Sequence, residues 1–127
     1  MNGTISVANA TGQDSRAIEA AAHAYASHTG RYRSLTKWEK DDSGNLVGTF
    51  EIPLSVGIVG GVTNNHPIAK ICTKILKLQN VQELSCIMAA TGLAQNFAAM
   101  HALVTEGIQY VMHMHVQLLQ LHDCLVL

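Results

Sequence analysis

Residues 1–30 read MNGTISVANATGQDSRAIEAAAHAYASHTG, and their pattern decides the fold that we expect for the chain. Apolar Ile5 and Val7 alternate with polar or small neighbours, as residues do in a strand with one buried face. Asn9 is polar where the apolar face would continue, so that face is brief. The stretch therefore predicts a short strand over residues 4–8, which a Thr-Gly turn ends.

An alanine-rich segment follows this turn and predicts a helix over residues 16–27, with Gly30 as its stop. Asp14, just before the helix, has two interpretations. Aspartate is among the best N-cap residues, and the residues by themselves favour that role. Asp14 also stands where the expected strand meets the helix, a junction at which layered α/β proteins often present functional groups.

The composition limits the classes of protein and partner. Of the 127 residues, 48% are apolar and 13% are charged, against roughly 25% charged in typical soluble domains. Both a piece of a larger assembly and a compact, weakly charged small domain fit these values. The formal charge is −1 and no basic run occurs, so nucleic acid has no electrostatic support as a partner.

Cysteine usage and apolar runs indicate the compartment. Cys72, Cys86 and Cys124 are odd in number and widely spaced, which favours reduced thiols over a disulfide framework. The first residues do not form a secretory signal, and no apolar run reaches the ~18–20 residues of a membrane span. We expect a cytoplasmic protein without a membrane partner.

Further along the chain, the pattern predicts a hairpin and three helices. Strands are expected over residues 35–40 and 46–52, around a turn-rich loop. A helix is expected to open at Pro67, a second to run over residues 81–91, and a third to follow a break at Gly92. The apolar stripe expected to face the core from the first of these consists of Ile68, Ile71, Cys72, Ile75 and Leu76. The inward positions expected on the third are Leu93, Phe97, Met100 and Leu103.

Residues 54–63, LSVGIVGGVT, are apolar and rich in glycine. The spacing of Gly57, Gly60 and Gly61 matches neither a dinucleotide fingerprint nor a Walker loop. A turn in which the backbone is crowded is the favoured explanation, and ligand contact is the alternative.

Several of these stretches resemble one family in order and in spacing. They are NGTISVANATGQD, RAIEAAAHAYAS, LTKWEK, EIP, VGG, GLAQNFAA and ALVTEGIQ. Together they are similar to the 3-hydroxy-3-methylglutaryl-coenzyme A (HMG-CoA) reductases of the bacterial, soluble branch (class II). The resemblance implies an α+β fold, with helices packed on a small mixed sheet in a fragment of the large substrate-binding domain. Residues 1–109 would be a partial catalytic domain and residues 110–127 a divergent tail.

The resemblance also implies an activity. These enzymes reduce HMG-CoA to mevalonate with two hydrides from NADH or NADPH, and their site forms between the subunits of a homodimer. In the family a catalytic lysine precedes the Met-Asn-Gly that opens this chain, and a catalytic glutamate and the Asp-x-Met-Gly-x-Asn signature lie further upstream. Met1 would then be an internal residue of the full enzyme. We therefore expect the C-terminal part of a reductase, inactive by itself.

The resemblance assigns roles to particular residues. Asp14 matches the aspartate that hydrogen-bonds the catalytic lysine, and Asn2 matches an asparagine that contacts the hydroxymethylglutaryl end of the substrate. Gly60 and Gly61 match a segment close to the substrate and cofactor. Val62 departs from the alanine or glycine of the family there, which puts the shape of the pocket in doubt.

The family's catalytic histidine, a general acid toward the coenzyme A thiolate, has no direct match. In strict register its position is Met112, and His113 matches it if one residue has been inserted, with His115 as the next choice. A shifted reading frame near Tyr110 is one explanation for this tail. A metal site on His113, His115, His122 and Cys124 is the rival explanation, but the spacing fits no compact zinc pattern, and we expect no metal.

Two other classes stay open. One is a non-catalytic remnant or interaction module that keeps the scaffold. The other is an independent nucleotide-binding domain, for which only the glycine-rich residues 57–61 speak.

Overall fold

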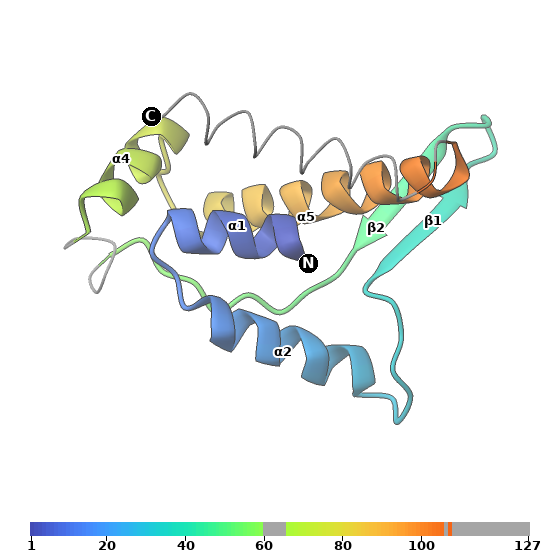
Figure 1. Cartoon of the computed structure of the whole chain (residues 1–127), viewed down its shortest axis with the longest axis horizontal. Helices are drawn as coiled ribbons and strands as arrows, with labels where there is room; N and C mark the ends of the chain where they lie inside the picture. Colours follow the sequence, from blue (N-terminus) through green and yellow to red (C-terminus); the bar gives the residue numbers. More distant parts are fainter. Residues whose placement is uncertain (60–65, 106, 108–127) are drawn as a thin grey trace, which may run out of the picture. The chain divides into compact units, whose positions relative to one another are not determined.

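The computed structural model describes residues 1–59, 66–105 and 107. Four helices and two strands follow one another in these residues: α1 (Asn2–Ala10), α2 (Ser15–Ser27), β1 (Thr36–Lys40), β2 (Leu46–Phe50), α4 (Pro67–Leu76) and α5 (Val81–Val104) (Figure 1). The chain divides into two compact units, residues 1–95 and 96–127, and the core lies in the first. The predicted α+β class is confirmed.

The predicted strand over residues 4–8 is wrong, because this stretch lies within helix α1. Gly3, Thr4 and Ala8 are buried, and their spacing follows a helix rather than a strand. Ile5 and Val7 are both partly buried against the core, one at each margin of the buried face of the helix. Two apolar residues at i and i+2 therefore looked like the alternation of a strand. Packing against another helix outweighs the weak strand preference of a short segment.

Small residues allow α1 to lie very close to α5. A Cβ atom on Gly3 would stand 2.7 Å from the carbonyl oxygen of Thr91, and one on Gly92 would stand 2.3 Å from Thr4 Oγ1. The Thr4 hydroxyl donates to the carbonyl of Met88 at 3.2 Å, and the Gly3 amide donates to the side chain of Gln95. Gly92 therefore allows a close helix contact. The predicted helix break at Gly92 is wrong, because α5 continues through this residue.

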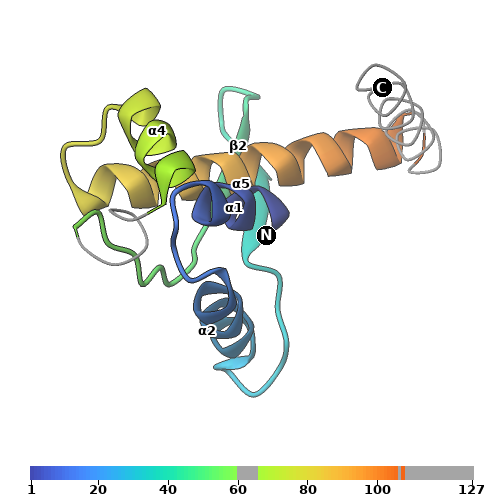
Figure 2. The ribbon, with the colours of Figure 1, turned by 60° about the vertical axis from the view of Figure 1, so that its left-hand side comes forward.

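Helix α2 forms as predicted. It runs from Ser15 to Ser27 with Asp14 as its N-cap, and it buries Ile18, Ala22 and Ala26 at helical spacing. Gly30 ends the following turn with φ +83°, a conformation that glycine adopts at no steric cost. Helix α2 follows α1 directly and contacts it (Figure 2).

The predicted hairpin is also confirmed, with β1 antiparallel to β2 and Trp38 opposite Gly48. The ring of Trp38 covers Gly48 so closely that a Cβ atom there would meet it at 2.3 Å. In the described residues the sheet is this two-stranded antiparallel pair, not the mixed sheet that had been predicted. Beyond β2 the chain stays extended, and its inward residues Leu54, Val56 and Ile58 pack against the core.

The core forms where α1, α2, α5 and this extended segment meet. Its fully buried members are Ala8, Ile18, Leu84 and Met88. The last two lie in the first half of α5, within the helix predicted over residues 81–91.

The predicted core positions further along are exposed. Phe97, Met100 and Leu103 lie in the second unit, and between 43% and 53% of each residue is accessible. In α4 the predicted stripe is divided, because Cys72 and Leu76 are half-buried whereas Ile68, Ile71 and Ile75 face solvent. In α4 and α5 the periodicity placed apolar residues on helices as observed, but it could not tell which of these residues the chain covers.

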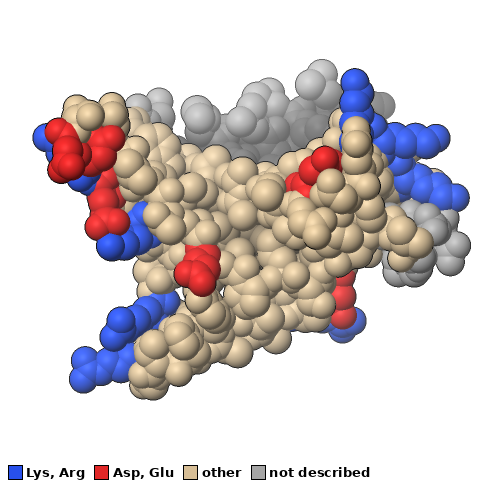
Figure 3. Space-filling view, turned by 180° about the vertical axis from the view of Figure 1, so that it is seen from behind, with Lys and Arg blue, Asp and Glu red and all other residues tan. Residues whose placement is uncertain are grey.

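Helix α5 is apolar on all sides. Among the described residues it is the one helix long and apolar enough to cross a membrane, a test that the core helix of a soluble protein also passes. Figure 3 shows a face of the molecule on which charged side chains leave wide uncharged areas. A helix without a polar face is typical of the interior of a larger protein or of a membrane.

We predict that Gly92→Ala destabilises the chain by about 1–3 kcal/mol, because the new methyl group overlaps Thr4 and the ring of Phe50. Urea denaturation followed by circular dichroism measures the change. Gly57→Ala is the matched control, since nothing lies within 4 Å of a Cβ atom at that position. Equal unfolding midpoints for the two variants would contradict the close contact between α1 and α5.

Candidate functional site

Asp14 lies in the short connection between α1 and α2. Its Oδ1 accepts hydrogen bonds from the backbone N–H groups of Arg16 at 3.1 Å and Ala17 at 3.2 Å, so the predicted cap is confirmed. Within the described part of the chain Oδ2 makes no hydrogen bond, and the side chain is exposed. One carboxylate oxygen thus holds the helix start, while the other is open to a further partner.

The surroundings of Asp14 differ from the predicted strand–helix junction, because the element before it is helix α1. A hollow of about 460 Å³ opens here, and its described lining consists of residues 9 and 12–16. The hairpin does not contribute to it. Among the residues that the structure describes, the carboxylate therefore stands on an open surface and not in a cleft between sheet and helices.

Gln13 ties this connection to the glycine-rich stretch. Its Nε2 donates to the carbonyl of Gly57 at 2.8 Å, and its Oε1 accepts from the Gly57 amide at 2.9 Å. The side-chain amide thereby imitates the paired bonds of a neighbouring strand. Two segments separated by 44 residues in sequence are held together beside Asp14.

Gln13 was not predicted from the sequence to be part of the site. A glutamine before an N-cap carries no distinctive signal, because its role depends on a partner far along the chain. The sequence offered only its place in the Gly-Gln-Asp motif.

Asn2, the other predicted site residue that the structure describes, is not brought together with Asp14. Asn2 is exposed at the first position of α1, and the nine residues of that helix separate the two by about 13 Å of rise. Gly60 and Gly61 lie outside the described residues, as does His113. Within residues 1–59, 66–105 and 107, no three His, Cys, Asp or Glu side chains gather as they would around a metal ion.

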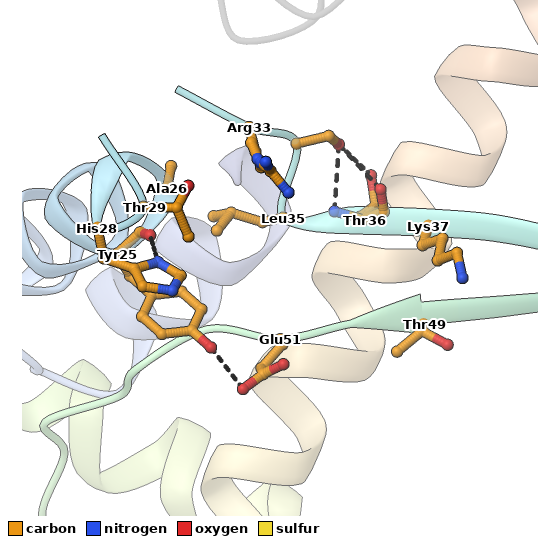
Figure 4. Close-up of a pocket in the computed structure, with 11 residues that line it drawn as sticks. Tyr25, Ala26, His28, Thr29, Arg33, Leu35, Thr36, Lys37, Thr49 and Glu51 are labelled. Carbon is orange, nitrogen blue, oxygen red and sulfur yellow. Dashed lines mark hydrogen bonds between the residues drawn. The ribbon is translucent and has the colours of Figure 1, made fainter. Parts of the chain in front are cut away.

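A second hollow, of about 270 Å³, lies between the end of α2 and the hairpin (Figure 4). Tyr25 points across it and donates a hydrogen bond to Glu51 Oε1 at 2.6 Å, and the ring of His28 stacks on Tyr25 with centroids 4.7 Å apart. Lys37, also in the lining, pairs with Glu39 at 2.7 Å. Lys37 is therefore paired within the chain, and Glu51 accepts a hydrogen bond from Tyr25.

The hydrogen bond to Glu51 changes the acidity of Tyr25. The carboxylate accepts a hydrogen bond from the phenol and repels a phenolate, so the pKa of Tyr25 is raised above its ordinary value of 10.0. The side chain of Tyr25 stays protonated throughout the neutral range and acts there as a donor.

Comparison with known proteins decides the family. The sequence profile described as hydroxymethylglutaryl-coenzyme A reductase matches residues 1–118, nearly the whole chain. The chain belongs to the HMG-CoA reductase family. The 3-hydroxy-3-methylglutaryl-coenzyme A reductase of Archaeoglobus fulgidus is 57% identical over 109 residues, and the probable reductase of Borreliella burgdorferi is 43% identical over the same length.

Solved structures of HMG-CoA reductases agree. The class II reductase of Streptococcus pneumoniae bound to NADPH in open conformations superposes with a TM-score of 0.79 at 44% identity, over 85% of this chain. A further structure of the reductase from this organism gives a TM-score of 0.78 at 42% identity. This chain covers 26% and 28% of those chains, and 25% of each curated relative. It therefore spans about a quarter of the length of the reductases it matches.

We predict that Asp14→Ala lowers the free energy of unfolding by about 1 kcal/mol, because the first turn of α2 loses its side-chain acceptor. Asp14→Asn keeps an oxygen at the same place and should unfold within a few tenths of a kcal/mol of the parent chain. Chemical denaturation of the three proteins measures both values. Equal losses in the two variants would mean that the charge, and not the cap, stabilises this helix start.

We also predict that Glu51→Gln lowers the pKa of Tyr25 toward its ordinary value, because the anionic acceptor is removed. Absorbance titration of the phenolate, with Tyr25→Phe used to isolate its signal from the other tyrosines, measures the shift. Glu39→Gln is the matched control, since Glu39 pairs with Lys37. An unchanged titration in Glu51→Gln would show that the hydrogen bond does not persist in solution.

Proposed function

We propose that this chain forms part of the catalytic domain of an HMG-CoA reductase, which reduces HMG-CoA to mevalonate. The observation that carries the proposal is the hydrogen-bonded pair of Gln13 and Gly57. It holds the Gly-Gln-Asp turn, where Asp14 keeps one carboxylate oxygen open, against the segment that leads into the glycine-rich stretch. Gln13 of the Gly-Gln-Asp motif is thus joined to Gly57, which precedes Gly60 and Gly61 in the sequence.

Asp14 is proposed to act on a lysine ammonium group that the rest of a reductase supplies. Its Oδ2 is free to accept a hydrogen bond from that group while Oδ1 keeps the helix cap. The cap fixes the orientation of the carboxylate, so binding the lysine would cost the aspartate little further side-chain freedom. The lysine could then stabilise the oxyanion that develops on the substrate.

The other roles follow the resemblance. Asn2 is proposed to contact the hydroxymethylglutaryl end of the substrate through its exposed amide, and His113 to protonate the departing coenzyme A thiolate. NADH or NADPH would supply the hydrides. Gly60 and Gly61 are proposed to allow the backbone to approach the cofactor, and the open space around neighbouring Gly57 agrees with a ligand near this stretch.

The setting of the chain is proposed on the same grounds. We expect residues 1–109 to belong to the catalytic domain and residues 110–127 to be a divergent tail. The parent enzyme is expected to be a cytoplasmic homodimer that binds neither nucleic acid nor membrane, in keeping with a formal charge of −1 and no basic run.

A non-catalytic remnant or interaction module is the second candidate. The exposure of Asp14 on an open surface favours it, because a carboxylate that acts in catalysis commonly stands in a pocket that excludes water. The two candidates differ in whether the chain supports chemistry once the remainder of a reductase is present.

We predict that the purified chain forms no mevalonate from HMG-CoA and NADPH, measured by cofactor absorbance and by product analysis. Mevalonate formed above the level of an Asp14→Asn control would contradict this.

The role of Asp14 is tested in a chimera in which residues 1–107 replace the matching segment of the Streptococcus pneumoniae reductase. Asp14→Asn in an active chimera should lower kcat roughly 100-fold or more at an unchanged melting temperature. A folded chimera without activity would favour the remnant, and full activity in Asp14→Asn would remove Asp14 from the mechanism.

A further inference from the structure

Helix α4 presents two different apolar faces. The first consists of Ala69, Cys72, Thr73 and Leu76, which are buried or half-buried, and it turns toward the core, where α4 contacts α1. The second consists of Ile68, Ile71 and Ile75 and lies about a third of a turn around the helix. These three isoleucines are 60%, 57% and 71% exposed.

The spacing of the exposed isoleucines has a physical meaning. Positions i, i+3 and i+7 form the narrow seam along which one helix packs against another. Isoleucine at each position gives a stiff, shaped surface, since β-branched side chains have few rotamers. A single exposed apolar residue needs no explanation, but three in one row mark a contact surface.

We propose that this isoleucine seam is the surface on which the remaining three quarters of a reductase catalytic chain docks. The inference rests on the proposed function, because it takes the rest of a reductase as the partner. The chain spans only a quarter of the reductases it matches, so a large polypeptide that could cover the seam exists in each relative. The seam fits an apolar helix face.

Charge on α4 argues against a second copy of this chain as the occupant. Lys70 and Lys74 flank the seam, Lys77 follows at the helix end, and α4 contains no acidic residue. Figure 3 shows basic side chains gathered over this helix. Two seams packed together would bring these lysines near one another without carboxylates between them, whereas a partner with an acidic rim would pair with them.

The area of the seam also argues against a second copy of this chain as the occupant. A stable interface buries on the order of 1,200–2,000 Å² in total. Each copy would have to contribute half of this area, and a ten-residue helix with one row of three isoleucines buries much less. A contact that continues inside a larger domain has no such minimum, because the surrounding core supplies the remaining area.

The experiment co-expresses the tagged full chain with a Streptococcus pneumoniae class II reductase from which the matching segment has been removed. The chain should recover the truncated reductase, and Ile71→Glu should reduce the recovery about 10-fold or more, because the contact would bury an unpaired carboxylate. Leu46→Glu is the matched control. Leu46 is 59% exposed, close to the value for Ile71, but it lies in β2, away from the seam.

A second measurement does not depend on whether the truncated reductase folds. In the chimera described above, Ile71→Glu should lower the melting temperature by about 5 °C or more relative to Leu46→Glu. In the isolated chain the two variants should melt together. Equal melting temperatures in the chimera, or a chimera that does not fold, would overturn the proposal.

The remaining outcomes separate the docking surface from the catalytic proposal. Recovery that Ile71→Glu abolishes, without any mevalonate formed by the complex, supports the docking surface and contradicts the proposed function. An isolated chain that is dimeric in size-exclusion chromatography and becomes monomeric with Ile71→Glu would overturn docking of the reductase segment in favour of a second copy.

Discussion

The contact between α1 and α5 is the constraint on which the described fold depends. Gly3 and Gly92 leave no room for side chains between the two helices, and the hydroxyl of Thr4 reaches a backbone carbonyl across the gap. With α1 fixed in this way, Ala8 joins the core and the chain turns at once into α2. The position of Asp14 is therefore a consequence of a packing contact some ten residues upstream.

The candidate site is organised by backbone hydrogen bonds more than by charge. Asp14 caps α2, and Gln13 holds Gly57 through its side-chain amide. Neither bond requires a ligand, so this turn is ordered before any partner binds. Such preorganisation lowers the entropy that binding must overcome, and in the described residues the second carboxylate oxygen of Asp14 makes no hydrogen bond.

The distribution of apolar surface explains the composition of the chain. A charged share of 13% is low for a free domain, and the apolar side chains of α5 surround that helix on all sides. The exposed isoleucines of α4 add a second apolar surface. These features are consistent with a segment that forms one part of a larger interior, as its coverage of a quarter of its relatives indicates.

The sequence by itself determined the family and, through it, the α+β class, because matching stretches follow one another in order along most of the chain. It also determined the helix capped by Asp14 and the hairpin, because each depends on local chemistry that a few neighbouring residues carry. Tertiary structure alone decided that residues 2–10 form a helix and that Gly92 lies within one. It also decided that Gln13 binds Gly57, a bond between residues 44 positions apart. Where two backbones lie close together, the only sign in the sequence is a small residue such as glycine. A periodic pattern does not tell which distant segment that residue contacts.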